Sequence, residues 1–282
     1  MVIKDIRPSP IAGQWYSADA SRLKQEIDDY IQQASVPELD GEVVAVAAPH
    51  AGYIYSGATA GYAYRTVLGE SYDLVAVISP YHQFHPNALL TTAHQAYQTP
   101  LGQIPVSQEG IHKLDEFLQT NNGERIHPIA KDQEHSLEIE LPFLQSALSG
   151  EFDLLPVMIS GFEPGLAVTV GQGLADIFKG KRGLLVASTD LSHFHSEETA
   201  NVLDTTILDA VARFSTDEVI LAHRSGKGQA CGVMAVLAVM VASKELGATH
   251  AKVLHYSTSG ETSGDFSSVV GYGAVAFLKK EE

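Results

Sequence analysis

The chain has 282 residues, of which 45% are hydrophobic, and a formal net charge of −16 at pH 7. A soluble globular chain of this length buries one large hydrophobic core or two modest ones. The acidic balance leaves no basic face to neutralise phosphates, which argues against nucleic acid or an anionic membrane as partner. A small molecule or a cation is the favoured ligand.

The cysteine count and the N-terminal residues indicate the cellular compartment of the protein. Cys231 is the only cysteine, which excludes an internal disulfide framework and fits a reducing compartment. The first residues, "MVIKDIRPSP", lack an apolar signal region, and the longest apolar stretch, at 233–242, is about half of the roughly 20 residues that a membrane span needs. We therefore expect a cytoplasmic protein without a transmembrane segment.

Short apolar runs alternate with helix-like segments along the whole chain. The runs predicted as strands lie at 43–48, 73–79, 152–159, 183–188, 250–257 and 268–278. The helix-like segments lie at 17–34, 57–67, 107–120, 165–178, 197–213 and 231–246. This alternation is typical of an α/β fold whose mostly buried sheet is covered by helices on both faces. No linker or repeat interrupts it, so we predict one domain spanning 1–282.

The stretch at 80–106 fits a helix poorly because of its proline and glycine content, and a long loop with a hairpin is the preferred interpretation. Loops of this length often carry function.

Polar residues follow three of the predicted strands at their carboxyl ends, where ligands bind in α/β sheets. His50 follows the first run, His82 the second, and Asp190 and His193 the run at 183–188. Imidazole nitrogens from separate strands at one sheet edge favour a transition metal over Mg or Ca. Simpler roles stay open: a hydrogen-bonded loop histidine, or Asp190 as the cap of a following helix.

Two further segments carry candidate residues. In "KDQEHSLEIELPFL", at 131–144, a helix would place His135 and Glu138 on one face as metal ligands, supporting residues or a proton relay. A solvated face of an amphipathic helix is the alternative. Cys231 opens the most apolar helical segment, where a helix N-terminus lowers a thiol pKa and favours a thiolate ligand or nucleophile; inert packing is the alternative.

Several motifs together resemble the Memo family over nearly the whole chain. They are "RPSPIAGQWY", "APHAGYIYSG", "SPYHQ", "TPLG", "DQEHSLEIELPFLQ", "STDLSHF" and "ACG". That family in turn resembles the class III extradiol dioxygenases, which hold non-haem Fe(II) with two His and one Glu in a three-layer α/β/α sandwich. Bacterial and archaeal members look like the B component that accompanies an AMMECR-type protein and a radical SAM protein. The resemblance thus implies this fold and those two partners.

The resemblance also implies roles for individual residues. His50 and His82 match the two metal-binding histidines, Cys231 matches the cysteine in the third ligand position, and Asp190 and His193 match the polar pair of the same pocket. The chain departs from the pattern at Gln83, where many relatives have a second histidine. A cysteine in place of the dioxygenase Glu also changes the ligand set on which oxygen activation depends, and a soft thiolate suits Cu(I) as well as Fe.

Three functional hypotheses follow from these residues. The first is a redox or dioxygenase-like metalloenzyme with Fe(II) or Cu at His50, His82 and Cys231. In it, Asp190, His193 and His135 act as proton donors, proton acceptors or further ligands. The second is a Zn-dependent hydrolase in which Asp190 or Glu138 is the general base. The third is a binding module that takes a peptide or a partner protein without turnover.

Overall fold

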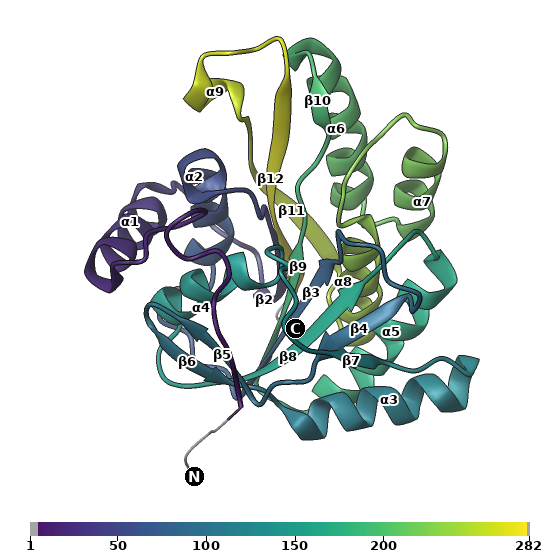
Figure 1. Cartoon of the computed structure of the whole chain (residues 1–282). Coiled ribbons are helices and arrows are strands. Elements are labelled where there is room, and N and C mark those ends of the chain that lie inside the picture. The colour runs from purple at the N-terminus through teal and green to yellow at the C-terminus, as the bar shows by residue number, and fades with distance from the viewer. Residues whose placement is uncertain (1–4, 281–282) are drawn as a thin grey trace.

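A mixed β-sheet runs through the centre of the computed structural model, which describes residues 5–280 (Figure 1). Within that range the sheet has nine strands in the order β10-β12-β2-β9-β3-β8-β4-β7, and β11 pairs with β12. Its strands are β2 (Glu42–Ala48), β3 (Leu74–Pro80), β4 (Leu89–Thr92), β7 (His127–Ile129), β8 (Asp153–Ile159), β9 (Gly183–Ser188), β10 (His193–His195), β11 (His250–Thr258) and β12 (Val269–Lys279). Strands β2, β9, β3 and β8 are parallel, whereas β12 and β4 join them antiparallel.

Helices cover both faces of the sheet. They are α1 (Ala20–Gln33), α2 (Tyr53–Arg65), α3 (Gln108–Asn122), α4 (Leu141–Ala147), α5 (Pro164–Phe178), α6 (Glu197–Ala212), α7 (Thr216–Arg224), α8 (Val233–Glu245) and α9 (Gly260–Ser263). Side chains alternate along β3, so Val75 and Val77 pack on α1, α2 and α4, while Ala76 and Ile78 pack on α3, α5 and α8. This arrangement confirms the predicted α/β sandwich with a buried mixed sheet.

Most predicted elements match the structure to within a few residues at their ends. The stretch at 80–106 contains more structure than a loop with one hairpin, because β4 joins the main sheet before the hairpin of β5 (Ala96–Thr99) and β6 (Gly102–Pro105). That hairpin forms a second, small sheet with β1 (Ile6–Arg7). Helix α7 was not predicted, although Ser215 caps it by accepting a hydrogen bond from the backbone N–H of Glu218.

The segment at 131–144 differs from its prediction. Residues 133–137 are irregular, a single 3₁₀ turn spans Glu138–Glu140, and α4 begins only at Leu141. The prediction of a helix already at His135 is therefore wrong. Polar side chains of this segment bind backbone N–H groups, as Asp132 and Glu134 do, and such bonds compete with helix formation.

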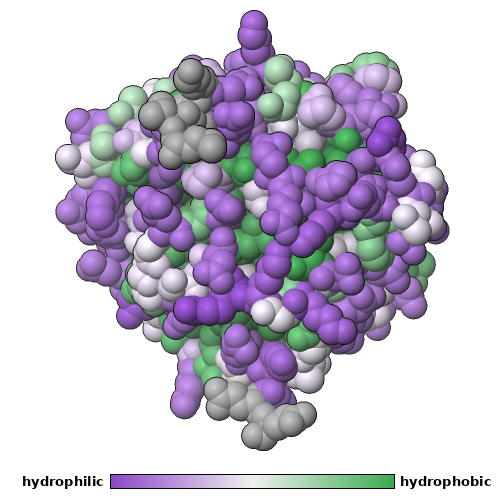
Figure 2. All heavy atoms as spheres, turned by 90° about the horizontal axis from the view of Figure 1, so that it is seen from below, coloured by the Kyte–Doolittle hydropathy of each residue, from purple (hydrophilic) through white to green (hydrophobic). Residues whose placement is uncertain are grey.

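The surface is largely polar on the face shown in Figure 2, where hydrophobic side chains are visible only between hydrophilic ones. Among the helices of residues 5–280, none has the length and apolar character required to cross a membrane.

Candidate functional site

The carboxyl ends of three neighbouring strands bring the site together. Strands β2, β9 and β3 lie side by side and parallel, with Ala48 paired to Ser188 and Ile78 paired to Ala187. His50 therefore leaves the sheet beside Asp190, whose Oδ1 accepts the His50 backbone N–H at 2.7 Å. The topology delivers these residues to one edge, as the sequence predicted.

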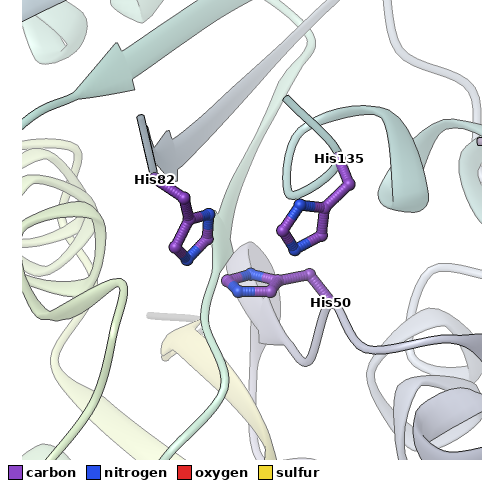
Figure 3. A group of neighbouring side chains, drawn as sticks. All are labelled: His50, His82 and His135. Carbon is purple, nitrogen blue, oxygen red and sulfur yellow. The ribbon is translucent and has the colours of Figure 1, made fainter. Parts of the chain in front are cut away.

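Three histidines meet at this edge (Figure 3). The rings of His50, His82 and His135 each offer a nitrogen, and these atoms lie within 4.8 Å of one another. The His82 and His135 rings stack with centroids 4.9 Å apart, and the His50 ring meets the His82 ring edge-on at 5.4 Å. His135 arrives from the irregular segment at 133–137, so the loss of the predicted helix is what brings it to the cluster.

Glu134 binds the ring of His82 and lies next to the ring of His135. Its Oε1 lies 3.0 Å from Nδ1 of His82 and 3.3 Å from Nδ1 of His135. Burial opposes its charge, yet hydrogen bonds from the side chain and backbone of His82 and from the Ser136 N–H hold the Glu134 pKa well below its usual value. An ionised carboxylate only accepts hydrogen bonds, so the His82 imidazole directs Nδ1–H toward it and keeps the lone pair on Nε2. The backbone N–H of His135 also donates to Glu134 Oε1, at 2.9 Å.

The third ring is oriented by a hydroxyl. The Ser188 hydroxyl donates to the Ser136 carbonyl at 2.6 Å, so it accepts the Nδ1–H of His50 at 2.9 Å. His50 too therefore keeps the lone pair on Nε2. Protein ligands of metal ions have this arrangement, in which the second ring nitrogen is held by a carboxylate or another acceptor.

Protonation of the cluster is opposed by its surroundings. Burial, and then the neighbouring histidines, lower the pKa of His50, and burial lowers the pKa of His135 to about 4. His82 differs, because the hydrogen bond and charge of Glu134 raise its pKa against the effect of burial. Neutral His50 and His135 present free lone pairs at pH 7, which is the state that a metal ion needs.

Cys231 lies beside His50 rather than at the centre of the three rings. Its Sγ is 3.1 Å from Nε2 of His50, and Gly232 makes this approach possible because a Cβ there would stand 2.3 Å from the Ser188 carbonyl oxygen. Helix α8 begins only at Val233. Burial, and then the charge of Asp190, raise the pKa of the thiol, so the expectation of a lowered thiol pKa is wrong for this structure.

Asp190 and His193 lie next to the cluster. Burial raises the pKa of Asp190 to about 7 although the His50 N–H stabilises its charged form. His193 donates Nδ1–H to the Leu191 carbonyl at 3.0 Å, and burial lowers its pKa. A carboxyl with this pKa exchanges protons near neutrality, which is the requirement for a general acid or base.

Glu138 does not join the histidines. Its carboxylate is bound by the Arg7 guanidinium, by Ser9 Oγ, and by the Tyr16 hydroxyl at 2.7 Å. Arg7 also binds Asp132 through Nη2 at 2.7 Å, and all three charged side chains are buried. The prediction that Glu138 shares a face with His135 and acts in proton transfer is corrected: the residue belongs to a closed ion-pair cluster.

Sequence reasoning missed Glu134 and Trp15. Glu134 stands directly before His135, and a carboxylate next to a candidate ligand was the available signal. The Trp15 ring packs against the His135 ring, with centroids 4.1 Å apart and the two planes tilted by 30°, and no pattern around "GQWY" predicted this contact. Gln83, which replaces a histidine of many relatives, is exposed, and within the described residues it makes no hydrogen bond.

The fold and the site define an α/β protein with a histidine cluster of the metal-binding kind. Comparison with known proteins assigns the family: the model of Memo-like proteins matches residues 7–276, and the chain belongs to the Memo family. Similar relatives carry the name MEMO1 family protein. That of Nitrosopumilus maritimus is 32% identical over 97% of this chain and 100% of its own length, and that of Aquifex aeolicus is 32% identical over 97% and 99%.

A third relative, the MEMO1 family protein of Methanosarcina mazei, is 32% identical over 96% of this chain and 98% of its own length. Among solved structures, the uncharacterized protein JW3007 from Escherichia coli K12 is 14% identical, with a TM-score of 0.48 over 84% of this chain and 100% of that one.

Proposed function

We propose that the chain is a redox metalloprotein that holds non-haem Fe(II) or Cu at His50, His82 and His135. The observation that carries this proposal is the convergence of the three rings: each offers a nitrogen within 4.8 Å of the others, and His50 and His82 also direct Nδ1 to a hydrogen-bond acceptor and keep Nε2 for a ligand. Three imidazole nitrogens suit Fe, Cu or Zn, whereas Mg and Ca require oxygen ligands.

Cys231 gives the site a fourth donor on the His50 side. A thiol beside a histidine ligand favours Cu(I) or Fe over harder ions, since soft sulfur selects them. A bound Fe or Cu ion would supply one-electron chemistry that no side chain of the site provides. A cytoplasmic, reducing compartment belongs to this proposal because it keeps the thiol reduced.

The surrounding residues of the chain supply proton transfer and binding. Asp190, with a pKa of about 7, is the proposed acid and base, and His193 is a second proton carrier beside it. A cavity of about 500 Å³ is lined by aromatic residues, among them Trp15 and Tyr53, and by the charged residues Arg22 and Glu26, and the Trp15 ring packs against His135. A small-molecule or peptide ligand would reach the site over this aromatic surface. AMMECR-type and radical SAM proteins are the proposed protein partners.

Metal analysis of protein purified without oxygen tests the proposal. We expect close to one Fe or Cu per chain, oxygen uptake or a reversible redox wave, and loss of the metal in His50→Ala and His82→Ala variants that keep the fold, because strand-end loops contribute little to the core. Redox-silent zinc at full occupancy would favour a hydrolase instead. Tight peptide binding that persists after chelation would favour a binding module.

A further inference from the structure

Asp204 is a buried carboxylate outside the site described above. It lies on α6, one of the helices that cover the sheet, and it is fully buried. Its Oδ1 accepts the backbone N–H of Ser192 at 2.8 Å, and its Oδ2 accepts the Tyr256 hydroxyl at 2.8 Å. Burying a carboxylate is costly unless it is hydrogen-bonded, so these two bonds are what keep Asp204 inside the protein.

The backbone of β12 makes room for this carboxylate. A Cβ at Gly271 would stand 1.8 Å from Asp204 Oδ2. The same glycine pairs with the segment that Asp204 binds, since its carbonyl accepts the Leu191 N–H at 2.8 Å and its N–H donates to the Ser192 carbonyl at 2.9 Å. Leu191 and Ser192 are therefore held by β12 and by Asp204 together.

The segment held in this way carries His193. The Leu191 carbonyl accepts the Nδ1–H of His193 at 3.0 Å, so the neutral ring keeps its lone pair on Nε2. Strand pairing alone does not fix this residue, because the register of β10 against β12 is irregular between His193 and His195, and Phe194 has a left-handed φ of 61°. The orientation of the His193 ring thus depends on how Leu191 and Ser192 are held.

We propose that Asp204 is a positioning residue for His193: by binding the Ser192 N–H it fixes the Leu191 carbonyl, which selects the His193 tautomer whose Nε2 is free to take up a proton. The inference rests on the proposed function for the use of His193 as a proton carrier. Asp204 makes no hydrogen bond to the three clustered histidines within residues 5–280, so this role is separate from metal binding.

The charge of Asp204 acts on the same ring. Burial lowers the pKa of His193, the hydrogen bond to the Leu191 carbonyl and the negative charge of Asp204 oppose this, and the charges of His82 and His195 add to it. Removing the charge of Asp204 without removing its hydrogen bond should therefore leave the His193 tautomer unchanged and move the titration of His193 to lower pH.

Long-range ¹H–¹⁵N NMR of metal-free protein with labelled histidine tests the proposal, because it identifies the tautomer of each ring, and a His193→Gln variant assigns the signals. We expect the Nδ1–H tautomer in the wild type. Asp204→Ala should shift His193 toward the Nε2–H form that an unconstrained histidine prefers. Asp204→Asn should keep the wild-type tautomer, since its amide oxygen still accepts the Ser192 N–H, and His193 should titrate at lower pH. Asp209→Asn, which removes an exposed charge from the same helix, should change neither.

Gly271→Ala provides a second variant, which displaces the Asp204 carboxylate without removing it and should also shift the tautomer. An Nε2–H tautomer of His193 in the wild type, or the wild-type tautomer in folded Asp204→Ala or Gly271→Ala, would overturn the positioning role. An unchanged His193 titration in Asp204→Asn would overturn it as well, by showing that the carboxylate does not act on this ring. Failure of the wild type to bind Zn²⁺, Fe²⁺ or Cu would overturn the proposed function instead, and the tautomer measured on metal-free protein would stand.

Discussion

Two polar clusters include residues of the same segment, 132–138. They differ in how many of their polar atoms have a hydrogen-bond partner. In the first, Arg7 binds Asp132, Glu138 and the Glu134 carbonyl, and Ser9 and Tyr16 fill the remaining carboxylate oxygen. In the second, Ser188 and Glu134 accept the Nδ1–H groups of His50 and His82, and Glu134 also lies 3.3 Å from Nδ1 of His135. Nitrogens of the three rings converge, and the Cys231 thiol lies 3.1 Å from Nε2 of His50.

The difference separates a structural role from a binding role. Burial alone does not distinguish the clusters, because Glu134 and Glu138 are both almost fully buried. Every carboxylate oxygen of Asp132 and Glu138 has a hydrogen-bond partner. In the histidine cluster, Nε2 of His82 and Nε2 of His135 have no hydrogen-bond partner among residues 5–280, and Nε2 of His50 faces only the Cys231 thiol. Buried polar groups are normally satisfied, so convergent free lone pairs indicate a site for a ligand.

The largest expected effect is on stability, from Arg7→Met. The change leaves Asp132 and Glu138 buried without their cation, and breaking a buried ion pair in this way costs about 3–5 kcal/mol. Urea denaturation measures the loss. Adding Glu138→Gln should restore part of the lost free energy of unfolding, because it removes one of the two buried carboxylates that have no cation. If the double variant is no more stable than Arg7→Met, the closed ion-pair cluster is contradicted.

Glu140 lies between the two cases, because the Tyr64 hydroxyl donates to its Oε2 whereas its Oε1 has no hydrogen-bond partner among residues 5–280. We expect this buried carboxyl to make the free energy of unfolding depend on pH. Its pKa of about 8 lies above the value of the unfolded chain, so the stabilisation is complete below the unfolded pKa and is lost as pH rises toward 8. Between pH 5.5 and 7.5 the wild type with chelator should lose about 2–3 kcal/mol relative to Glu140→Gln in urea denaturation. Parallel pH profiles for the two proteins would refute this.

A matched pair of variants four residues apart sharpens the comparison. Glu134→Gln should weaken metal binding about 10–100-fold, because an amide does not hold the Nδ1–H group of His82 as strongly as a carboxylate does. Glu138→Gln should leave the metal affinity within about threefold and lower stability by about 1–3 kcal/mol instead. Isothermal titration with Zn²⁺ compares them, and an equal loss of affinity in both would show that the clusters are not separate.

The smallest expected effect comes from Tyr16→Phe. The change removes one hydrogen bond to Glu138 Oε1, which Ser9 continues to contact, so we expect a loss of about 1 kcal/mol. Metal content should be unchanged, even though Trp15 next to it packs against His135. Thermal unfolding gives the stability change, and metal analysis of the same preparation gives the metal content per chain. A loss of metal would mean that the N-terminal segment also positions the metal ligands.

The fold was predictable from the sequence because continuously apolar strands and amphipathic helices carry their own periodicity. His50 and His82 were predictable for a related reason, since each follows a strand end. His135 was identified but assigned to a helix, and Glu138 was assigned to the wrong cluster, because their positions depend on Arg7, which lies more than a hundred residues earlier. Local spacing contains no information about such a long-range ion pair. The Cys231 thiol pKa was misjudged because burial outweighs the helix terminus, and burial is visible only in three dimensions.

X-ray absorption of the metal-loaded protein tests the central claim most directly, since it distinguishes nitrogen from sulfur ligands and counts imidazoles by their multiple scattering. The structure predicts three imidazole nitrogens on the ion, from His50, His82 and His135, and loss of one imidazole in His135→Ala with the other two retained. Two imidazoles with one sulfur, unchanged in His135→Ala and altered in Cys231→Ser, would contradict it and restore the ligand set that the family resemblance implied.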